Sequence, residues 1–466
     1  MKKILYLQGH ARYAREWGIL GEIIQTLEEN SENDVYYMDC NNTFNGFCWL
    51  TQNYHWGYCK KCQHGCHKIL EHLNFSKKKI LKIEKVKIPQ IPNFGSIQEA
   101  LQYEKDGYHI AFGAINCLMT ALRDYDFDIK KYRNLINKFI SVEYTTLKNL
   151  EKFFNEYKFD EIHTFNGRFS LNHPLVEFAQ KKGIPYTTYE FGANLNKYSI
   201  YTNNVPHDFY HLKNEIIKYW QNSNDENKEI LAKKWFEERR AGKFQATESF
   251  TKKQIKNLLP KDFDFKKENI VFFNSSIDEV YAFECWKHPF VKNENELLFN
   301  LFEHYKDDSS KHFYLRVHPN LTKAKKMHTT QIKQINEMKK KYKNLTVIEP
   351  DEKIDTYALM DVADKVVTVY STTGFEATYY GKISIFAGKA PYEDLDCCYQ
   401  ANSLEELYNL IDSKNLKPKP KENTYAYAYY KQVYGENYKY YIINSLNDGN
   451  FMGLEIDSKH KMKYFK

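Results

Sequence analysis

The sequence predicts an α/β protein with two Rossmann-like domains, and three observations support this. The chain has 466 residues, which is too long for one typical core and suits two domains of about 200 residues. Short apolar runs rich in β-branched residues alternate with helix-like segments, as expected for parallel strands buried on both faces. Several of these runs end in small polar or cationic residues, and ligands bind at the carboxyl ends of such strands.

The N-terminal half opens on an apolar strand over residues 3–7. Gln8, Gly9 and His10 follow it and form the first turn between a strand and a helix. A second strand is expected over 34–38, where the chain is again apolar. This half therefore begins as a Rossmann-like domain.

Two later strands of this half also end in polar side chains. They are expected over 161–165 and 185–189, with a helix between them. Asn166 and Arg168 follow the first strand, and Glu190 follows the second. We therefore expect these side chains at the carboxyl edge of the N-terminal sheet.

A polar, proline-containing stretch over 259–267 precedes a fresh strand. We take it as the linker between an N-terminal domain over 1–262 and a second domain over 268–420. Residues 421–466 form the third segment, with a Tyr-rich helix expected over 425–445.

The second domain has three strands with polar carboxyl ends, expected over 270–273, 312–317 and 366–369. Pro319 stops the middle strand and fixes the turn after it. We expect a nucleotide- or phosphate-binding edge formed by residues at these strand ends, namely Ser275, Ser276, Glu279, Arg316, His318, Ser371, Thr372, Thr373, Gly374 and Glu376.

The turn over 371–374 is the most informative of these segments. Its hydroxyl groups, free backbone N–H groups and the positive end of the following helix converge on one point, which favours phosphate. Glu376 lies one turn into that helix, where it faces a ribose hydroxyl or acts as a favourable first-turn charge. An ordinary capped turn is the alternative for this turn taken alone.

Five cysteines and three histidines lie within or beside residues 40–67. Cys59, Cys62 and Cys66 have a spacing with which a short loop directs thiolates at one ion. We predict a compact Cys-rich insertion with a structural zinc ion held by these three residues and Cys48, or by Cys40 or a nearby His as the fourth ligand. An iron–sulfur cluster and free thiols are the alternatives, since disulfides are not expected in the cytoplasm.

The composition fits a globular protein, with 42% hydrophobic and 27% charged residues. No apolar run approaches the roughly 20 residues of a membrane span, and the start is too strand-like for a signal peptide. We expect a cytoplasmic protein, with lysine clusters at 77–79, 339–341 and 459–466 that allow peripheral contact with the inner membrane surface. The 38 Tyr and 31 Phe are taken as compositional, and no nucleic-acid partner is expected.

The motifs together resemble those of bacterial capsule and lipopolysaccharide biosynthesis glycosyltransferases of GT-B architecture. The matching segments fall in the family's order between about residues 160 and 395, namely 166–168, 189–192, 273–279, 316–320, 357–364 and 371–376, with Gly381 and Lys382. The His-Pro turn and the later Ser/Thr turn are also similar to the nucleotide-binding pair of bacterial sialyltransferases and Kdo transferases. The resemblance implies two Rossmann-like domains facing across a cleft, a nucleotide-sugar donor, and a polysaccharide or lipid-linked glycan acceptor.

The resemblance also implies roles for these residues. Without a metal, the departing phosphate needs preorganised donors, which the 371–374 turn, His318 and Arg316 would supply. Glu190 is the leading candidate for the base that accepts the acceptor's proton, His10 is its rival, and a salt bridge with Arg168 is the structural alternative. Asn166 and Arg168 would orient the acceptor or an anionic sugar. We expect inverting transfer from a CMP-activated acidic sugar, with UDP and GDP sugars as alternatives and no cofactor required for catalysis.

Two other functions remain open at this point. The nonhydrolysing sugar-nucleotide epimerases share the two-domain architecture and the phosphate turn. A non-enzymatic assembly or redox module built on the Cys-rich insertion is the third hypothesis. The acidic run over 124–128 has no strand context, so we expect it to be a loop rather than a metal-binding motif.

Overall fold

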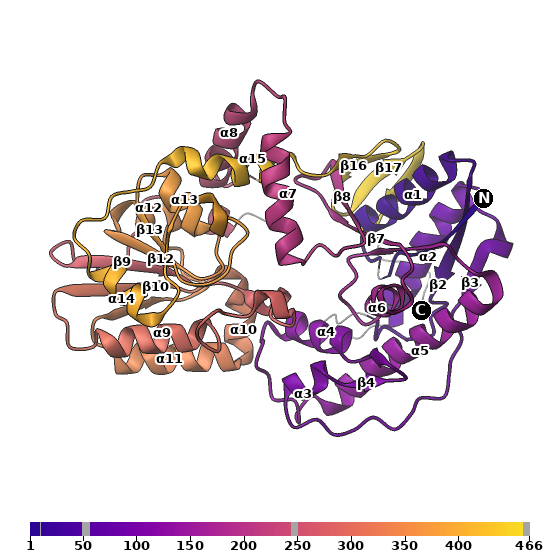
Figure 1. Ribbon diagram of the computed structural model, residues 1–466, viewed down its shortest axis with the longest axis horizontal. Helices are drawn as coiled ribbons and strands as arrows, with labels where there is room; N and C mark the ends of the chain where they lie inside the picture. The colour runs from indigo at the N-terminus through magenta and orange to yellow at the C-terminus, as the bar shows by residue number, and fades with distance from the viewer. Residues whose placement is uncertain (10, 49–55, 244–249, 460–466) are drawn as a thin grey trace. The chain divides into compact units, whose positions relative to one another are not determined.

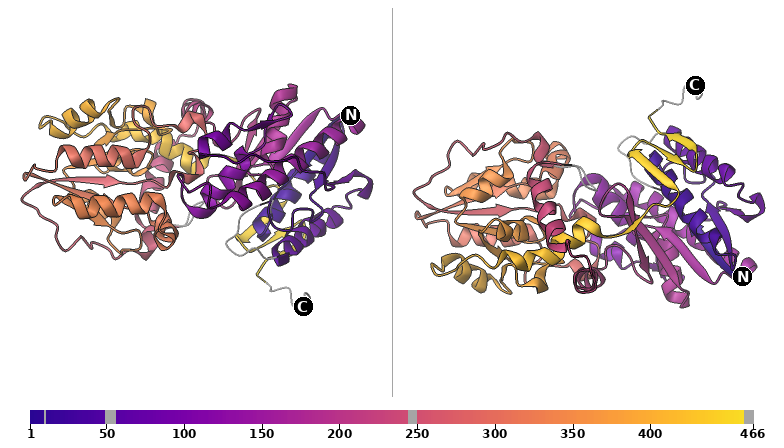
Figure 2. Two further views of the ribbon diagram at one scale, coloured as in Figure 1. Left: turned by 90° about the horizontal axis from the view of Figure 1, so that it is seen from below. Right: turned by 90° about the horizontal axis from the view of Figure 1, so that it is seen from above.

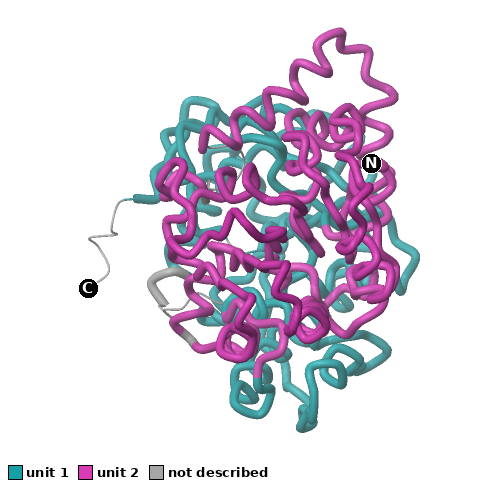
Figure 3. Tube along the Cα trace, turned by 90° about the vertical axis from the view of Figure 1, so that its left-hand side faces the viewer, with its two compact units in different colours: residues 1–121, 128–206, 435–466 teal, residues 122–127, 207–434 magenta. Residues whose placement is uncertain are grey.

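The computed structural model describes residues 1–9, 11–48, 56–243 and 250–459. The chain divides into two compact units, shown in different colours in Figure 3. Unit 1 comprises residues 1–121, 128–206 and 435–466, and unit 2 comprises 122–127 and 207–434.

Unit 1 is built on a seven-stranded sheet with the order β15-β8-β7-β6-β1-β2-β3. Figure 1 labels β2, β3, β7 and β8 of this sheet. The strands are β1 (Lys2–Leu7), β2 (Asn33–Asp39), β3 (Ile80–Lys82), β6 (Glu161–Phe165), β7 (Tyr186–Phe191), β8 (Lys197–Thr202) and β15 (Glu436–Asn437). The first five are parallel to one another, whereas β8 is antiparallel to both β7 and β15. The order changes direction between β1 and β6, so their carboxyl ends flank the point where such sheets bind ligands.

Helices and a small hairpin complete the main body of unit 1. They are α1 (Ala14–Glu29), α2 (Trp56–His72), α3 (Ile97–Leu101), α4 (Phe112–Leu122), α5 (Arg133–Tyr157) and α6 (His173–Lys182), with the hairpin β4 (Glu104–Lys105) and β5 (Tyr108–His109). Buried side chains of α1 and α2 pack against one face of the sheet, where they contact residues of β1 and β2.

A three-stranded antiparallel sheet at the end of the chain packs on α1. Its strands are β16 (Tyr441–Ser445), β17 (Asp448–Phe451) and β18 (Leu454–Asp457). Two glycines of α1 make room for its aromatic rings, because a Cβ atom at Gly18 would lie 2.4 Å from the Tyr441 ring and one at Gly21 would lie 2.6 Å from the Phe451 ring. The buried Glu22 carboxylate accepts hydrogen bonds from the backbone N–H groups of residues 439, 440 and 441.

Unit 2 is built on a six-stranded sheet in which every neighbouring pair is parallel. Its order is β11-β10-β9-β12-β13-β14. The strands are β9 (Glu268–Phe273), β10 (Lys311–Arg316), β11 (Leu345–Ile348), β12 (Lys365–Thr368), β13 (Ile383–Phe386) and β14 (Tyr399–Gln400). Numbered within the unit, this is 3-2-1-4-5-6, the Rossmann order, and it places the ligand-binding point between β9 and β12.

Helices cover both faces of this sheet (Figure 2). They are α7 (Phe209–Gln221), α8 (Lys228–Arg240), α9 (Glu294–His304), α10 (Thr322–Met327), α11 (Thr330–Lys341), α12 (Thr356–Val362), α13 (Thr373–Tyr379), α14 (Leu404–Asp412) and α15 (Tyr425–Val433). Helices α9, α11 and α14 share a core with Phe272 on one face, and α12 and α13 share a core with Phe273 on the other. Phe272 and Phe273 are neighbours on β9 and belong to opposite faces of the sheet, because successive side chains of a strand point to opposite faces.

The observed division differs from the predicted boundaries. Helices α7 and α8 pack with α15 inside unit 2, so the main segment of unit 2 begins at residue 207 rather than near 268. The predicted helix over 425–445 ends at Val433, and the segment that returns to unit 1 is a set of strands. Long-range packing that no local pattern reports decides these boundaries.

In the part of the chain that the structure describes, no helix is long and apolar enough to cross a bilayer.

Candidate functional site

The three polar strand ends predicted in the second half of the chain lie side by side in unit 2. Phe273, the last residue of β9, is in register with Arg316 of β10 and with Thr368 of β12. Neighbouring strands are about 4.8 Å apart, so the segments after these three residues emerge within roughly 10 Å of one another. The structure therefore brings together the two motifs expected to hold a nucleotide.

Hydrogen bonds tie the ends of β9 and β10 together. The backbone N–H of His318 donates to Asn274 Oδ1 at 3.2 Å, and Asn320 Nδ2 donates to Ser276 Oγ at 3.2 Å. Ser276 Oγ in turn donates to Asp278 Oδ1 at 2.6 Å. The predicted residues Ser276 and His318 thus belong to one network.

The His318 ring is neutral and accepts a hydrogen bond in this network. Its Nδ1 accepts the backbone N–H of Asn320 at 3.1 Å. Burial, together with the nearby positive charges of Arg316, Arg239 and Arg123, lowers the pKa of His318 to about 4. A neutral ring whose Nδ1 accepts carries its proton on Nε2, so the group that His318 can offer to an anion is an uncharged N–H.

Hydrogen bonds between its own residues stabilise the turn over 371–374. Ser371 Oγ accepts the Thr373 backbone N–H at 3.2 Å and contacts Thr373 Oγ1 at 2.8 Å. Gly374 is required by close packing, because a Cβ atom there would lie 2.5 Å from Thr368 Oγ1 and 2.6 Å from Tyr392 Oη. The three hydroxyl residues before Gly374 are each half-buried, which leaves them partly accessible.

Two residues that were predicted to bind the nucleotide, Arg316 and Glu376, instead form hydrogen bonds with other residues of unit 2. Arg316 donates from Nη1 to Glu349 O at 2.6 Å and from Nη2 to Glu352 O at 3.2 Å, and only 2% of it is exposed. Glu376 is buried and accepts from Tyr357 Oη at 2.6 Å and from Thr372 Oγ1 at 3.0 Å. In this structure they position the loops around the site, and direct contact with a nucleotide stays a prediction.

The residues that support the β9 loop carry no sequence motif. The buried Glu294 carboxyl group accepts from Asn274 Nδ2 at 2.7 Å and from the Ser275 N–H at 3.1 Å, and burial raises its pKa to about 8. Arg123 Nη1 lies 2.7 Å from Asp278 Oδ2 and 3.1 Å from Glu279 Oε1. Glu294 starts a helix and Arg123 lies 155 residues before Asp278, so no local motif marks either of them.

The acidic run that follows Arg123 contains no helix or strand over 123–131, as expected for a loop. Asp124 Oδ2 accepts the Thr330 N–H at 3.1 Å, at the start of α11.

In unit 1, the ends of β6 and β7 bring Asn166 and Glu190 together. Asn166 Nδ2 donates to Glu190 Oε2, and the Phe191 N–H donates to Glu190 Oε1 at 2.9 Å. The chain turns sharply after β6, with Asn166 at φ +63°, and the Arg168 N–H donates to Asn166 Oδ1 at 3.2 Å. The predicted acceptor-side residues are therefore adjacent at the carboxyl edge of this sheet.

The half-buried Glu190 has a perturbed pKa. Burial raises it above the ordinary value, while hydrogen bonds from Phe191 and Asn166 and the positive charges of Arg168 and Arg15 act in the opposite direction. The buried Arg15 guanidinium also stacks 3.6 Å from the centre of the Phe191 ring. A carboxylate with a raised pKa is suited to accept a proton near neutral pH. The rival base, His10, lies outside the described residues.

The cysteines expected in a loop lie partly on a helix. Cys59, Cys62 and Cys66 belong to α2, and Cys62 Sγ accepts the Ala11 N–H at 3.2 Å. Burial raises the pKa of the Cys40 and Cys48 thiols, and neighbouring thiols that include Cys62 raise it further. Among the described residues, which exclude 49–55, no group of three or more Cys, His, Asp or Glu side chains could hold a metal ion. The zinc site stays a prediction.

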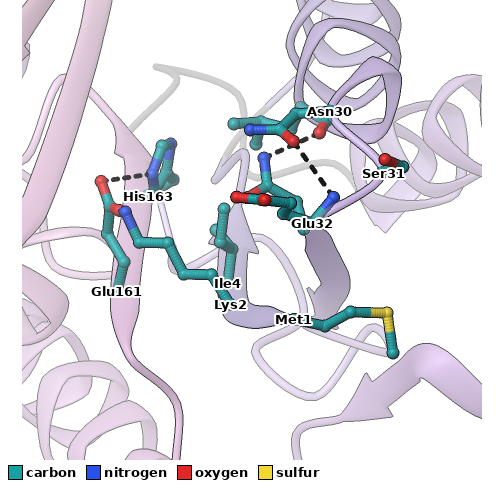
Figure 4. Close-up of a pocket in the computed structure, with 10 residues that line it drawn as sticks. Met1, Lys2, Ile4, Asn30, Ser31, Glu32, Glu161 and His163 are labelled. Carbon is teal, nitrogen blue, oxygen red and sulfur yellow. Dashed lines mark hydrogen bonds and ion pairs between the residues drawn. The ribbon is translucent and has the colours of Figure 1, made fainter.

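A cavity of about 650 Å³ lies at the opposite, amino end of the unit 1 sheet. Lys2, Glu161 and His163 line it (Figure 4), and His163 Nε2 lies 2.8 Å from Glu161 Oε1. Because ligands of open parallel sheets bind at the carboxyl ends of the strands, this cavity is separate from the candidate site.

Comparison with solved structures finds distant likenesses. They include a β-Kdo 2,4-transferase, KpsC, of Thermosulfurimonas dismutans, with 15% identity, a TM-score of 0.39, and coverage of 58% of this chain and 80% of that one. The β-Kdo 2,7-transferase of the same organism has 16% identity, a TM-score of 0.36 and coverage of 65% and 87%. The UDP-GlcNAc 2-epimerase of Methanocaldococcus jannaschii has 13% identity, a TM-score of 0.28 and coverage of 91% and 97%.

No curated protein sequence matches the chain. Residues 196–438, just over half of its 466 residues, match the family described as "Capsule polysaccharide biosynthesis protein". The matched region contains almost all of unit 2, with its Rossmann-ordered sheet and the three polar strand ends. The chain therefore belongs to the capsule polysaccharide biosynthesis protein family.

Proposed function

We propose that the protein is a glycosyltransferase that moves a sugar from a nucleotide-sugar donor to a capsule or lipopolysaccharide acceptor. The observation that carries the proposal is the register of β10, β9 and β12, which sets the neutral His318 and the 371–374 turn at one edge of a Rossmann-ordered sheet. Membership of the capsule biosynthesis family supports the class of acceptor.

In the proposed reaction, unit 2 binds the nucleotide of the donor. The bond between the anomeric carbon and the phosphate oxygen breaks, and its electron pair leaves with the phosphate. The Nε2–H of His318 and the N–H and hydroxyl groups of the 371–374 turn stabilise the departing charge. These donors are fixed before the reaction begins, so they pay no reorganisation cost at that moment.

The acceptor hydroxyl forms the new glycosidic bond and loses its proton to a base. We propose Glu190 for this role because its pKa is raised by burial and Asn166 orients it. Arg168 and Asn166 would orient the acceptor or an anionic sugar. The reaction would be inverting and would need no metal, with a CMP-activated acidic sugar as the favoured donor.

Nucleotide binding tests the proposal first. In a thermal-shift screen with CMP, UDP, GDP and CDP, the nucleotide of the natural donor should raise the melting temperature, since a ligand that binds the native state stabilises it. A nucleotide sugar incubated with the protein alone should stay unchanged. Its conversion without an acceptor would instead identify an epimerase. Loss of transfer in EDTA with the fold intact would refute the metal-independent mechanism.

A further inference from the structure

Unit 1 contains another cavity, of about 320 Å³, between the loop that follows β3 and the start of α5. Two lining residues belong to this loop, two directly precede α5, and three belong to the first turns of that helix. Sites for small molecules have volumes of roughly 300–1,000 Å³, so the cavity is large enough for a ligand. None of the sequence motifs described above includes its lining residues.

The buried part of the lining is apolar and adjoins an amide group. Phe94, Ile129 and Ile136 are buried, and the ring centres of Phe94 and Tyr103 lie 5.3 Å apart. Asn137 also lines the cavity, and its buried Oδ1 has no hydrogen-bond partner among the described residues. A buried acceptor without a donor is unfavourable, and a hydroxyl group of a ligand would satisfy it.

Two cations line the outer part of the cavity. Lys130 and Arg133 are exposed, and neither forms an ion pair within the ranges that the structure describes. The carboxylate that precedes them, Asp128, accepts the backbone N–H groups of Lys130 at 3.0 Å and of Lys131 at 3.4 Å. The first turn of α5 has no acidic side chain. The outer part of the cavity is therefore suited to an anion.

The cavity lies on the side of unit 1 where the parallel strands end. Helix α5 leads into the amino end of β6, so its own N-terminal end points towards the carboxyl edge of the sheet. Glu143, near the middle of α5, has its Oε2 3.1 Å from Nδ1 of His173, which starts α6 after the turn that carries Asn166 and Arg168. Arg133 precedes Glu143 by ten residues, or about 15 Å along the helix axis. A chain molecule bound at Asn166 and Arg168 could reach this cavity.

A sugar residue that carries a carboxylate matches the lining. The C–H groups on one face of its ring would pack on the apolar surface that includes Phe94, and a hydroxyl group would donate to Asn137 Oδ1. Its carboxylate would pair with Arg133, whose planar guanidinium group can donate two parallel hydrogen bonds. An inorganic anion would leave the apolar surface exposed, and an acyl chain would leave Asn137 Oδ1 without a donor.

We propose that this cavity is a second glycan subsite of unit 1, which binds a carboxylate-bearing sugar residue of the acceptor chain away from the end that reacts. Lys130 and Arg133 bind the carboxylate, and Asn137 binds a hydroxyl group. The inference rests on the proposed function, since it identifies the acceptor as an acidic glycan of more than one residue.

Surface plasmon resonance with acidic trisaccharides and their neutral esters tests the inference. The probes are trigalacturonate and α2,8-linked trisialate, each compared with its fully methyl-esterified form. Lys130→Gln combined with Arg133→Gln removes both charges, and Asn137→Leu removes the unpartnered acceptor. The matched control combines Lys131→Gln with Lys138→Gln, because both lysines are exposed in the same part of the chain but lie outside the cavity lining. Binding of CMP, UDP, GDP and CDP is measured on the same proteins.

We expect at least one acid to bind the wild type more tightly than its ester does. The Lys130 and Arg133 double variant should weaken binding of that acid about 4- to 25-fold, since an exposed ion pair contributes roughly two- to fivefold. Asn137→Leu should weaken it about two- to tenfold, the range for one neutral hydrogen bond. The control should bind the acid as the wild type does, and nucleotide affinity should be the same in every variant.

The outcomes separate this inference from the proposed function. If the wild type binds a nucleotide but neither acid, if acid and ester bind equally, or if the double variant matches the control, the glycan subsite is wrong and the proposed function stands. If the wild type binds none of the four nucleotides, the proposed function is wrong, and the assignment of the cavity to an acceptor falls with it.

Discussion

Replacing His318 with alanine tests the candidate site most directly. The substitution removes the Nε2–H that the neutral ring offers to an anion and the Nδ1 that accepts the Asn320 N–H. A matched control lies on the strand that precedes His318, because His312 is also half-buried and lies near the amino end of β10, where its Nε2 contacts Thr346 Oγ1 at 2.9 Å. His312→Ala removes a histidine from that strand without touching the polar edge.

The structure sets the expected size of the effect. A hydrogen bond to a charged phosphate contributes about 1.5–3 kcal/mol, so His318→Ala should weaken nucleotide binding about 10- to 150-fold. The unpaired Asn320 N–H should cost about 1 kcal/mol of folding stability, which leaves a folded protein to measure. His312→Ala should leave nucleotide affinity unchanged.

Calorimetric titrations at pH 5.5, 7 and 8 separate a neutral donor from a charged one. The pKa of His318 is about 4, so the ring stays neutral over this range and the ratio of wild-type to His318→Ala affinity should be constant. Titration of the phosphate itself cancels in that ratio. An affinity of His318→Ala within twofold of wild type would refute the placement of the nucleotide, and a ratio that rises as pH falls would show a charged imidazole.

Three further predictions follow from other parts of the structure. Glu190→Gln should keep donor affinity and lower the transfer rate about 10²- to 10⁴-fold, whereas transfer at the wild-type rate would make Glu190 structural and leave His10 as the candidate base. Metal analysis of protein purified without added zinc should find close to one equivalent bound through residues 40–67, and free reaction of those thiols in the native protein would reject the site. Glu294 has a pKa of about 8 in the folded state, above its ordinary 4.5, so it stabilises the fold most at low pH and loses this contribution as pH rises from about 4.5 to 8. Chemical denaturation should show wild type losing up to about 5 kcal/mol relative to Glu294→Gln over that interval, and parallel pH profiles would contradict the assignment.

The sequence predicts the local elements of the site well because their signals are local. The apolar runs before Ser275, His318 and Ser371 are observed as β9, β10 and β12, and the run over 161–165 is observed as β6 with the same bounds. Each strand is a short run rich in apolar residues that ends at a turn, and a short window of sequence contains both signals.

The parts that the sequence does not predict depend on distant contacts. The bonds of Arg316 to the carbonyl groups of Glu349 and Glu352 depend on the pairing of β10 with β11. Helices α8 and α15 are far apart in the chain and pack on each other inside unit 2. Cys59, Cys62 and Cys66 suit a metal-binding loop by spacing alone, and packing of α2 on α1 places them on a helix instead.

The aromatic cover of α1 has a consequence for synthesis on the ribosome. Unit 2 is complete once residue 434 has emerged, but the rings that fill the spaces above Gly18 and Gly21 belong to Tyr441 and Phe451. Helix α1 is therefore made long before the residues that cover its outer face. Domains generally fold as units during translation, so the nascent chain should complete unit 2 before unit 1 and carry an exposed apolar stripe on α1 in the meantime.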